Sequence, residues 1–371
     1  MKLLINTASC MRGGSVQVAY SFIRECLSIS GNDYGIIVGP SLQGLLREQE
    51  WPENFQVFNV DRRPAQKLGT ALKGDCFDDI ERAFQPDVVF TTSGPAYWKS
   101  KVPHLIGYNL AHYIYPDSPY FKQISAKEKM RWGLMKQAIK YFYNRDADAL
   151  VVQTDDVRER ALKLLRCDKI HTVYNTCGEH FFDPPKQDGI AIERESGCVY
   201  LLYLTAYYAH KNIEIINQVI PLLEARKANH FRFVLTLSQA DFERAILPEN
   251  RSIVTNLGPV PPEACPELYE QSDFVFLPTL LECFSASYAE AMATGKPILT
   301  SDLGFARTVC QEAAQYFDPI KPESIADAIL SLSADEKAQG EQILKGRHRL
   351  KTFNTARERA EKYLELCNQL L

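Results

Sequence analysis

Two glutamates, Glu282 and Glu290, are the side chains whose spacing most directly indicates chemistry. Residues 273–277 before them form a short apolar run typical of a buried parallel strand. Glu290 lies in a segment with helical apolar spacing that ends at Gly295 and Pro297. Eight residues of helix rise about 12 Å, so the two carboxylates could contact opposite ends of one extended polar ligand.

The backbone between the two glutamates is expected to bind an anion or a hydroxyl oxygen. The amides of Phe284, Ser285 and Ala286 would lie at a helix N-terminus, where partial positive charge favours such groups. A second interpretation is structural. Residues 287–290 fit a capping box, so that Glu290 would close its own helix, and Glu282 would then be a solvated loop residue. Spacing alone leaves both interpretations open.

Two glycines near the start of the chain, Gly13 and Gly14, indicate a possible phosphate-binding loop. They follow an expected strand at residues 2–7 and precede helical spacing at residues 16–27. Glycines at such a position let backbone N–H groups approach an anion, although a tight strand-to-helix turn has the same pattern. Neither Gly-x-Gly-x-x-Gly nor Walker A spacing is present, which argues against dinucleotide oxidoreductases and P-loop NTPases.

Lys211 and His112 are the other candidates for a site. Lys211 stands near the expected start of a helix at 213–226, where a lysine is unfavourable unless an anion offsets its charge. It therefore either binds a phosphate or is an exposed lysine that tolerates a small energetic penalty. His112 follows an expected strand at 104–108. Open α/β sheets place ligands at the carboxyl ends of their strands, so His112 is either a site residue or a structural histidine.

The apolar segments alternate with helical ones, which predicts an α/β protein with parallel sheets. The 371 residues suggest two domains. The polar segment 178–197, with Pro184-Pro185, is the expected linker. We therefore expect an N-terminal domain at 1–180, a C-terminal domain at 181–350 and a final helix at 351–371. The expected strands are 2–7, 35–39, 55–60, 87–92, 104–108, 148–154, 170–175, 198–204, 231–236, 253–257, 273–277, 298–300 and 314–317, with helices expected at 41–49, 76–84 and 121–145 among others.

Composition narrows the class of protein. The net charge of −4 does not indicate a nucleic-acid-binding protein. The sequence contains no run of 18 apolar residues, and Leu3 to Ile5 is too short for the core of a signal peptide. The ten cysteines form no Cys-x-x-Cys pair and the seven histidines show no ligand spacing, so we expect reduced thiols in a cytosol and no metal site.

The expected helix at 121–145 has an apolar face and a separate lysine stripe. The stripe consists of Lys122, Lys129, Lys136 and Lys140, whose spacings of seven, seven and four residues would keep them on one face. Glu128 is the one acidic residue within the segment. The stripe is either a solvated face or a patch for an anionic membrane surface or a lipid diphosphate.

The stretch around the two glutamates resembles the Glu-x7-Glu signature of the retaining group 1 (family four) glycosyltransferases, which have the GT-B fold. The matching residues are Thr279, Glu282, Phe284, Glu290, Ala291, Met292, Gly295, Pro297, Ser301, Asp302 and Gly304. The resemblance implies two Rossmann-like domains facing across a cleft, with a C-terminal helix crossing back to the first. Cys283 and Ser285 depart from the family, which usually has glycines there.

The resemblance also assigns roles to the candidate residues. Glu282 and His112 would contact the donor sugar as catalytic residues, and Glu290 the nucleotide ribose. The remaining donor-binding positions would be Gly13, Gly14, Thr205, Lys211, Val260, Phe284, Ser285 and Ala286. Thr205-Ala206 stands where most members have Gly-Arg, so a positive charge is missing, for which Arg12 or His210 could substitute.

By this resemblance we expect a retaining, metal-independent hexosyltransferase that uses a UDP- or GDP-sugar and needs no further cofactor. Its acceptor would be a saccharide or a lipid-linked sugar in bacterial surface polysaccharide synthesis. We expect it in the cytoplasm, peripheral on the inner face of the cell membrane, without a nucleic-acid partner. Two alternatives stay open: a nucleotide-sugar-binding GT-B protein without transferase activity, and a GT-B epimerase or phosphorylase.

Overall fold

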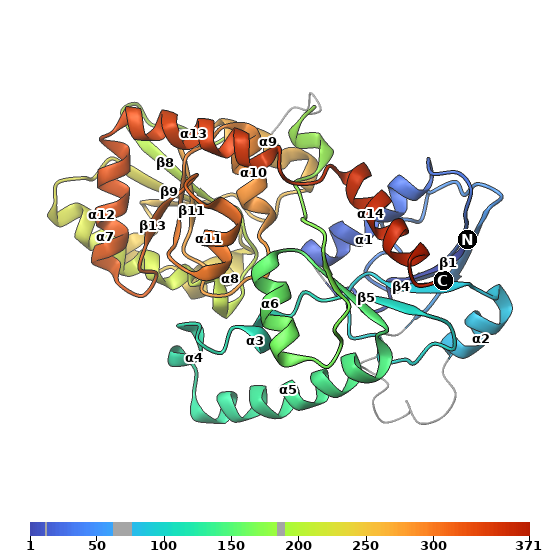
Figure 1. The fold of residues 1–371 in the computed structure, drawn as a ribbon. Coiled ribbons are helices and arrows are strands. Elements are labelled where there is room, and N and C mark those ends of the chain that lie inside the picture. The colour runs from blue at the N-terminus through green and yellow to red at the C-terminus, as the bar shows by residue number, and fades with distance from the viewer. Residues whose placement is uncertain (12, 62–75, 184–189) are drawn as a thin grey trace. The chain divides into compact units, whose positions relative to one another are not determined.

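The computed structural model describes residues 1–11, 13–61, 76–183 and 190–371, which form two compact units (Figure 1). The first unit contains Met1–Pro116, Ile124–Asn175 and Asn354–Leu371. The second contains Asp117–Gln123 and Thr176–Phe353. The chain therefore passes between the units at 116/117, 123/124, 175/176 and 353/354, and neither unit is one continuous segment.

A seven-stranded parallel sheet forms the centre of the first unit, in the order β3-β2-β1-β4-β5-β6-β7. Its strands are nearly continuous apolar runs, as expected where helices cover both faces. The strands are β1 Lys2–Asn6, β2 Asp33–Val38, β3 Phe55–Asn59, β4 Val88–Thr91, β5 His104–Gly107, β6 Ala149–Val152 and β7 Ile170–Thr172. The helices are α1 Gly14–Cys26, α2 Cys76–Phe84, α3 Ala111–Ile114, α5 Ala126–Asp146, α6 Asp155–Leu164 and α14 Ala356–Asn368.

The second unit has a six-stranded parallel sheet in the order β10-β9-β8-β11-β12-β13. Its strands are β8 Val199–Tyr203, β9 Phe231–Leu235, β10 Val254–Asn256, β11 Phe274–Leu277, β12 Ile298–Ser301 and β13 Gln315–Phe317. The α-helices are α4 Tyr120–Gln123, α7 Ile216–Ala225, α8 Gln239–Ala245, α9 Cys265–Glu270, α10 Ala286–Thr294, α11 Gly304–Cys310, α12 Pro322–Ser333 and α13 Glu336–Leu350. Short 3₁₀ turns are η2 Glu179–Phe181, η3 Ala209–Lys211, η4 Ile213–Ile215, η5 Pro248–Asn250 and η6 Pro262–Ala264.

The expectation of an α/β protein with parallel sheets is confirmed, and each expected strand forms within two residues at its start and three at its end. The division after Asn175 falls before the polar segment 178–197, of which residues 184–189, with Pro184-Pro185, lie outside the described residues. Among the helices in the described ranges, none is both long and apolar enough to cross a membrane.

One expected helix is wrong, and a second is interrupted near its start. Residues 41–48 form turns, as Gly44 weakens a helix that would otherwise follow Pro40. The helix expected at 121–145 is broken, because Ser125 caps a new helix. Its Oγ accepts from the Glu128 amide at 3.2 Å, while Glu128 Oε2 accepts from the Ser125 amide at 3.0 Å.

The break at Ser125 separates Lys122 from the other three lysines of the stripe. Lys122 lies in α4, which belongs to the second unit, whereas the three others lie on α5 in the first. The prediction that all four lysines lie on one face of a single helix is therefore wrong. The docking of residues 117–123 on the second unit is fixed by Ser118, whose hydroxyl donates to the Leu280 carbonyl at 2.7 Å.

Helix α14 completes the hydrophobic core of the first unit, and Figure 1 shows it beside α1. The Tyr363 ring lies 5.5 Å from the Phe22 ring and 5.0 Å from the Phe90 ring, both measured between centroids. The buried Arg359 donates to Asn175 and, at 2.8 Å, to the Ser21 hydroxyl. Aromatic packing and a buried guanidinium thus join the last residues of the chain to its first helix.

We predict that Tyr363→Ala lowers the free energy of unfolding by about 3–5 kcal/mol, as for other large aromatic side chains removed from a core. Urea denaturation followed by circular dichroism measures this change. Glu361→Ala, which removes only a half-exposed partner of Arg357 on the same helix, is the matched control and should cost about 0.5 kcal/mol or less. A change below about 1 kcal/mol for Tyr363→Ala would show that α14 contributes little to the core.

Candidate active site

The candidate site is built on two neighbouring strands of the second unit, β8 and β11. These strands are parallel and paired, with Val275 opposite Leu202, so the loops that follow them leave the sheet at the same edge. The loop after β8 contains residues 204–212, and the loop after β11 contains residues 278–285. The sequence places Lys211 on the first loop and Glu282 on the second.

Lys211 and Glu282 form a largely buried ion pair, in which Lys211 Nζ donates to Glu282 Oε1. The two side chains are only 17% and 15% exposed. Lys211 ends the 3₁₀ turn η3, and η4 begins at Ile213 and runs directly into α7, so the lysine stands just before a helical segment as expected. The anion that offsets its charge in this structure is the carboxylate of Glu282.

Hydrogen bonds join the two loops around this pair. The Tyr203 hydroxyl donates to the Lys211 carbonyl at 2.7 Å. The carbonyl of His210 accepts from the Leu280 amide at 2.7 Å and from the Thr279 hydroxyl at 3.2 Å. These contacts fix the position from which the lysine side chain extends.

Asn212, directly after the lysine, adds a third connection. It is buried and has the left-handed backbone conformation, with φ 56°, that asparagine tolerates better than most residues. Its side-chain nitrogen Nδ2 donates to the carbonyls of Pro278, at 3.2 Å, and Pro319, at 2.8 Å. The Lys-Asn pair therefore combines a charged site residue with the residue that holds its loop against the sheet edge.

Glu290 does not cap its own helix. Helix α10 begins at Ala286 after Ser285, whose side chain makes no capping hydrogen bond, and Glu290 is the fifth residue of the helix. Its Oε2 accepts instead from the Tyr269 hydroxyl at 2.6 Å. The capping-box interpretation is therefore wrong, and the carboxylate is held by Tyr269 instead.

Burial raises the pKa of Glu290 to about 7, while the hydrogen bond from Tyr269 and the positive charge of Lys211 lower it. Part of the Glu290 population is thus protonated near neutral pH. Perturbed carboxyl groups of this kind are common at functional sites, because such sites place charge where solvent is scarce.

Helix α10 begins at Ala286, so the backbone singled out in the sequence does stand at a helix N-terminus. Phe284 is buried against Phe353, with 6.0 Å between ring centroids, and Cys283 and Ser285 are buried as well. The first amides of an α-helix, here from Ala286 onward, have no acceptor within the helix. They lie in sequence between Glu282 and Glu290.

Thr205 lies on the same loop as Lys211, and Val260 follows β10 at the same edge of the sheet. The Thr205 amide donates to Thr236 Oγ1 at 3.0 Å and its hydroxyl to the Ala206 carbonyl at 3.0 Å, so both groups have local partners. Val260 is partly exposed and follows Gly258, whose φ of 77° belongs to the region that glycine adopts readily. The backbone of this turn is accessible.

Three candidates lie in the first unit, at the carboxyl edge of its own sheet. Gly13 and Gly14 stand at the start of α1 with open space where a side chain would be, and Gly13 has a φ of 60°. His112 lies in α3 after β5, and its ring stacks on that of Trp132, with centroids 4.3 Å apart.

The charge missing at Thr205-Ala206 is not supplied by His210. Burial and the neighbouring Lys211 lower the pKa of His210 to about 3, so its ring is neutral near pH 7. Arg12 lies outside the described residues. Arg244 of α8 brings a cation to the loop after β8, with its guanidinium carbon 3.9 Å from the centre of the Tyr207 ring.

Several residues of this site could not be identified from the sequence. Tyr269 and Tyr203 act through single hydroxyl groups on segments that read as ordinary buried helix and strand. Arg244 stands in α8, which the apolar pattern did not predict. Asn212 stands directly after Lys211 in the sequence, but nothing in the pattern indicated that Asn212 holds the loop.

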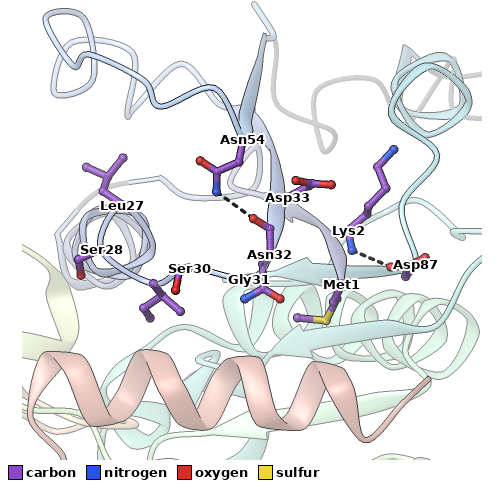
Figure 2. Close-up of a pocket in the computed structure, with 11 residues that line it drawn as sticks. Met1, Lys2, Leu27, Ser28, Ser30, Gly31, Asn32, Asp33, Asn54 and Asp87 are labelled. Atoms are coloured by element: carbon purple, nitrogen blue, oxygen red, sulfur yellow. Dashed lines mark hydrogen bonds between the residues drawn. The ribbon is translucent and has the colours of Figure 1, made fainter.

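An open depression in the first unit lies away from these candidates (Figure 2). It is lined by Met1, Lys2, Asp33, Asn54 and Asp87, which stand at or just before the amino ends of four strands. Two hydrogen bonds join residues of its lining. Asn54 Nδ2 donates to the Asn32 carbonyl at 2.8 Å, and the Lys2 amide donates to Asp87 at 2.6 Å. The opposite edge of an α/β sheet is the one that binds ligands.

Comparison with known proteins identifies relatives of both units. Residues 198–335 match the family described as glycosyl transferases group 1. An uncharacterized glycosyltransferase of Methanocaldococcus jannaschii is 24% identical over 255 residues, which cover 62% of this chain and 64% of that protein. A D-inositol 3-phosphate glycosyltransferase of Corynebacterium urealyticum is 30% identical over 115 residues, or 30% of this chain and 27% of that protein. The chain thus spans less than two thirds of these relatives.

Solved structures match the fold over the whole chain. Sucrose-phosphate synthase from Thermosynechococcus elongatus superposes with a TM-score of 0.78 at 15% identity, covering 100% of this chain and 99% of that one. HepE from Anabaena, solved in complex with UDP and glucose, has a TM-score of 0.71 at 14% identity, with both chains fully covered. At these identities the likeness concerns the fold.

We predict a pH dependence of stability from the raised pKa of Glu290. Between its ordinary value of 4.5 and about 7, the folded chain holds a proton that the unfolded chain releases. The contribution of Glu290 is therefore fully present below pH 4.5 and is lost as pH rises through about 7. Relative to Glu290→Gln, the wild-type free energy of unfolding should fall by about 1–3 kcal/mol over this range.

Urea unfolding of both proteins at several pH values measures this difference. The exposed Glu249→Gln of the same unit is the matched control and should keep the wild-type slope. A constant difference between wild type and Glu290→Gln from pH 4.5 to 7.5 would contradict the expectation.

Proposed function

Because the chain belongs to the group 1 glycosyltransferases of GT-B fold, we propose that it transfers a sugar from a nucleotide-diphospho-sugar to a saccharide or lipid-linked acceptor. The transfer retains the anomeric configuration and needs no metal ion. Support comes first from Lys211 and Glu282, which pair on two loops at one sheet edge, and from Glu290 on the following helix α10, whose pKa Lys211 lowers. HepE, which was solved in complex with UDP and glucose, supports a UDP-sugar as donor.

Each of the three residues has a part in this reaction. Lys211 binds the donor diphosphate and stabilises the negative charge that develops on it as the glycosidic bond breaks. When Lys211 turns from Glu282 to the phosphate, the freed carboxylate can hold sugar hydroxyls and favour the positive charge at the anomeric carbon. Glu290 accepts from the ribose hydroxyls, and the start of α10 offers backbone amides to the leaving group.

The other candidates complete the donor and acceptor sites of the proposal. The turn at Val260 receives the base through its backbone, and Thr205 lies beside the diphosphate. For Gly13, Gly14 and His112, the roles that the family resemblance gives them stay predictions. The acceptor attacks from the face that the leaving diphosphate vacates, and that phosphate takes the acceptor proton. We place this activity in bacterial surface polysaccharide synthesis at the inner face of the cell membrane.

A nucleotide-sugar-binding protein without transferase activity is the second candidate. The replacement of the family's Gly-Arg by Thr205-Ala206 favours it, because a single lysine then carries the diphosphate charge. A screen of UDP- and GDP-sugars by calorimetry identifies the donor. Mass spectrometry of acceptor saccharides incubated with that donor then decides: a product one sugar heavier supports transfer, whereas donor binding without product supports the second candidate.

We predict that Lys211→Ala weakens nucleotide-diphosphate binding by about 1.5–3 kcal/mol and leaves nucleoside binding nearly unchanged. The reason is the loss of one charge-assisted hydrogen bond to phosphate. Calorimetry with UDP and with uridine, or with the guanosine pair if GDP binds, measures both affinities. Equal UDP affinity in wild type and variant would remove Lys211 from the site.

Two controls accompany this measurement. The double variant Lys211→Ala/Glu282→Gln removes the carboxylate that the single change leaves without its cation, so any loss that persists belongs to the lysine. Lys321→Ala changes a lysine of the same unit whose side chain is 69% exposed, and it should bind UDP as wild type does.

We also predict that sugar transfer persists in excess EDTA, because Lys211 and backbone amides carry the charge stabilisation in the proposed mechanism. Across the described ranges no group of three or more His, Cys, Asp or Glu side chains is placed to hold a metal ion. The assay compares initial rates with and without EDTA. Complete loss of transfer, restored by Mg²⁺ or Mn²⁺, would overturn the metal-independent mechanism.

A further inference from the structure

Helix α5 has two apolar faces, and only one of them packs against the first unit. The inward face contains Trp132, Ile139 and Tyr143, spaced by seven and four residues so that they align. Trp132 stacks on His112, Ile139 is 5% exposed, and the buried Tyr143 donates to the Gly107 carbonyl at 3.2 Å. This face accounts for the attachment of the helix.

The second apolar face points away from the unit. Met130, Leu134 and Tyr141 are spaced by four and seven residues, and their exposed fractions are 65%, 69% and 59%. Nine residues, or about two and a half helical turns, separate Met130 from Ile139, so the two rows lie on opposite sides. Among the described residues of the first unit, Figure 1 shows no other helix or strand on the outer side of α5.

Positive side chains flank the exposed row on both sides. Lys129, Lys136 and Lys140 align on one flank, and Lys127 and Arg131 lie on the other. The negative charges of the helix are engaged elsewhere. Glu128 accepts from Ser125 in the capping box, and Asp146, fully buried, pairs with Arg145 at 2.5 Å. The outer surface of α5 is therefore an apolar row within a positively charged border.

We propose that this outer surface of α5 lies in the headgroup region of an anionic lipid bilayer. Met130, Leu134 and Tyr141 insert between the lipids, and the flanking lysines and Arg131 contact lipid phosphates. Single exposed apolar residues are ordinary on soluble proteins, but an aligned row of three between two rows of cations has the arrangement of an interfacial helix. The attraction of lysines to anionic lipids adds to the burial of the apolar row.

A second copy of this chain is the other occupant to consider, since an apolar row can also form a dimer. Two such helices would bring ten cations of the outer flanks together, five from each copy, and this repulsion disfavours the pairing. The same charge favours a surface of negative lipids. The lipid surface is therefore the occupant that the charge distribution supports.

The test is co-sedimentation of the full chain with vesicles of phosphatidylglycerol and phosphatidylcholine, and with vesicles of phosphatidylcholine alone. No donor or acceptor is present, so the outcome is independent of the proposed transferase activity. Met130→Gln/Leu134→Gln/Tyr141→Gln should lower the partition coefficient by about tenfold or more, since three partly buried apolar groups are lost. Lys129→Gln/Lys136→Gln/Lys140→Gln should lower it by about 100-fold at low salt, at about fivefold for each lysine.

The control variant is Leu344→Gln/Lys345→Gln on α13, which removes one exposed leucine, 67% exposed, and one lysine from another surface helix. It should bind vesicles as wild type does. Binding of the wild type should weaken with added salt and be much lower on uncharged vesicles. Circular dichroism of each variant verifies that the fold is kept.

Two outcomes would overturn the proposal. The first is equal vesicle binding by wild type and both α5 variants. The second is a wild-type dimer in sedimentation equilibrium without lipid that the apolar-row variant converts to monomer, which would assign the surface to a second copy of the chain.

Discussion

The buried ion pair between Lys211 and Glu282 is the interaction on which the arrangement of the second unit's loops depends. A lysine and a glutamate that are both mostly removed from water are stable only as partners, because either charge alone would bear its full desolvation cost. The backbone contacts of Tyr203 and Asn212 hold the lysine loop where the pair can form. The loop geometry and the charge pairing are therefore mutually dependent.

In the ligand-free structure, the charges of Lys211 and Glu282 already neutralise each other. In the proposed function, a phosphate would have to displace Glu282 from Lys211, so the net gain in binding free energy would be smaller than for an unpaired lysine. Glu290 lies close enough to Lys211 for the positive charge to lower its pKa, against the larger effect of burial. One cation thus influences two carboxylates, and moving it changes the charge balance of both.

The sequence predicted the strands well because a strand buried between helices must be apolar along its length, as Phe274 to Leu277 is. Helix boundaries were harder, since Ser125 interrupts an apolar pattern that is otherwise continuous and its capping role depends on Glu128 three residues later. Within the site, residue types and spacing identified Lys211, Glu282 and Glu290. Their pairing could not be predicted, because it depends on two loops 71 residues apart in the chain meeting at one sheet edge. The role of Tyr269 could not be predicted, because only its hydroxyl oxygen contacts Glu290 and the rest of the side chain resembles any buried tyrosine.

The route of the chain has a consequence for its modularity. Residues 117–123 interrupt the first unit and belong to the second, and residues 354–371 return to the first. A fragment cut as residues 176–353 would leave behind Ser118, the hydrogen-bond donor to Leu280, and Tyr120, whose ring lies 6.4 Å from that of His210. Residues 176–353, which contain the sheet that positions Lys211 and Glu282, are therefore not a complete unit that can be transferred on its own. A chimera that exchanges it between related proteins must also exchange the short segment that precedes α5.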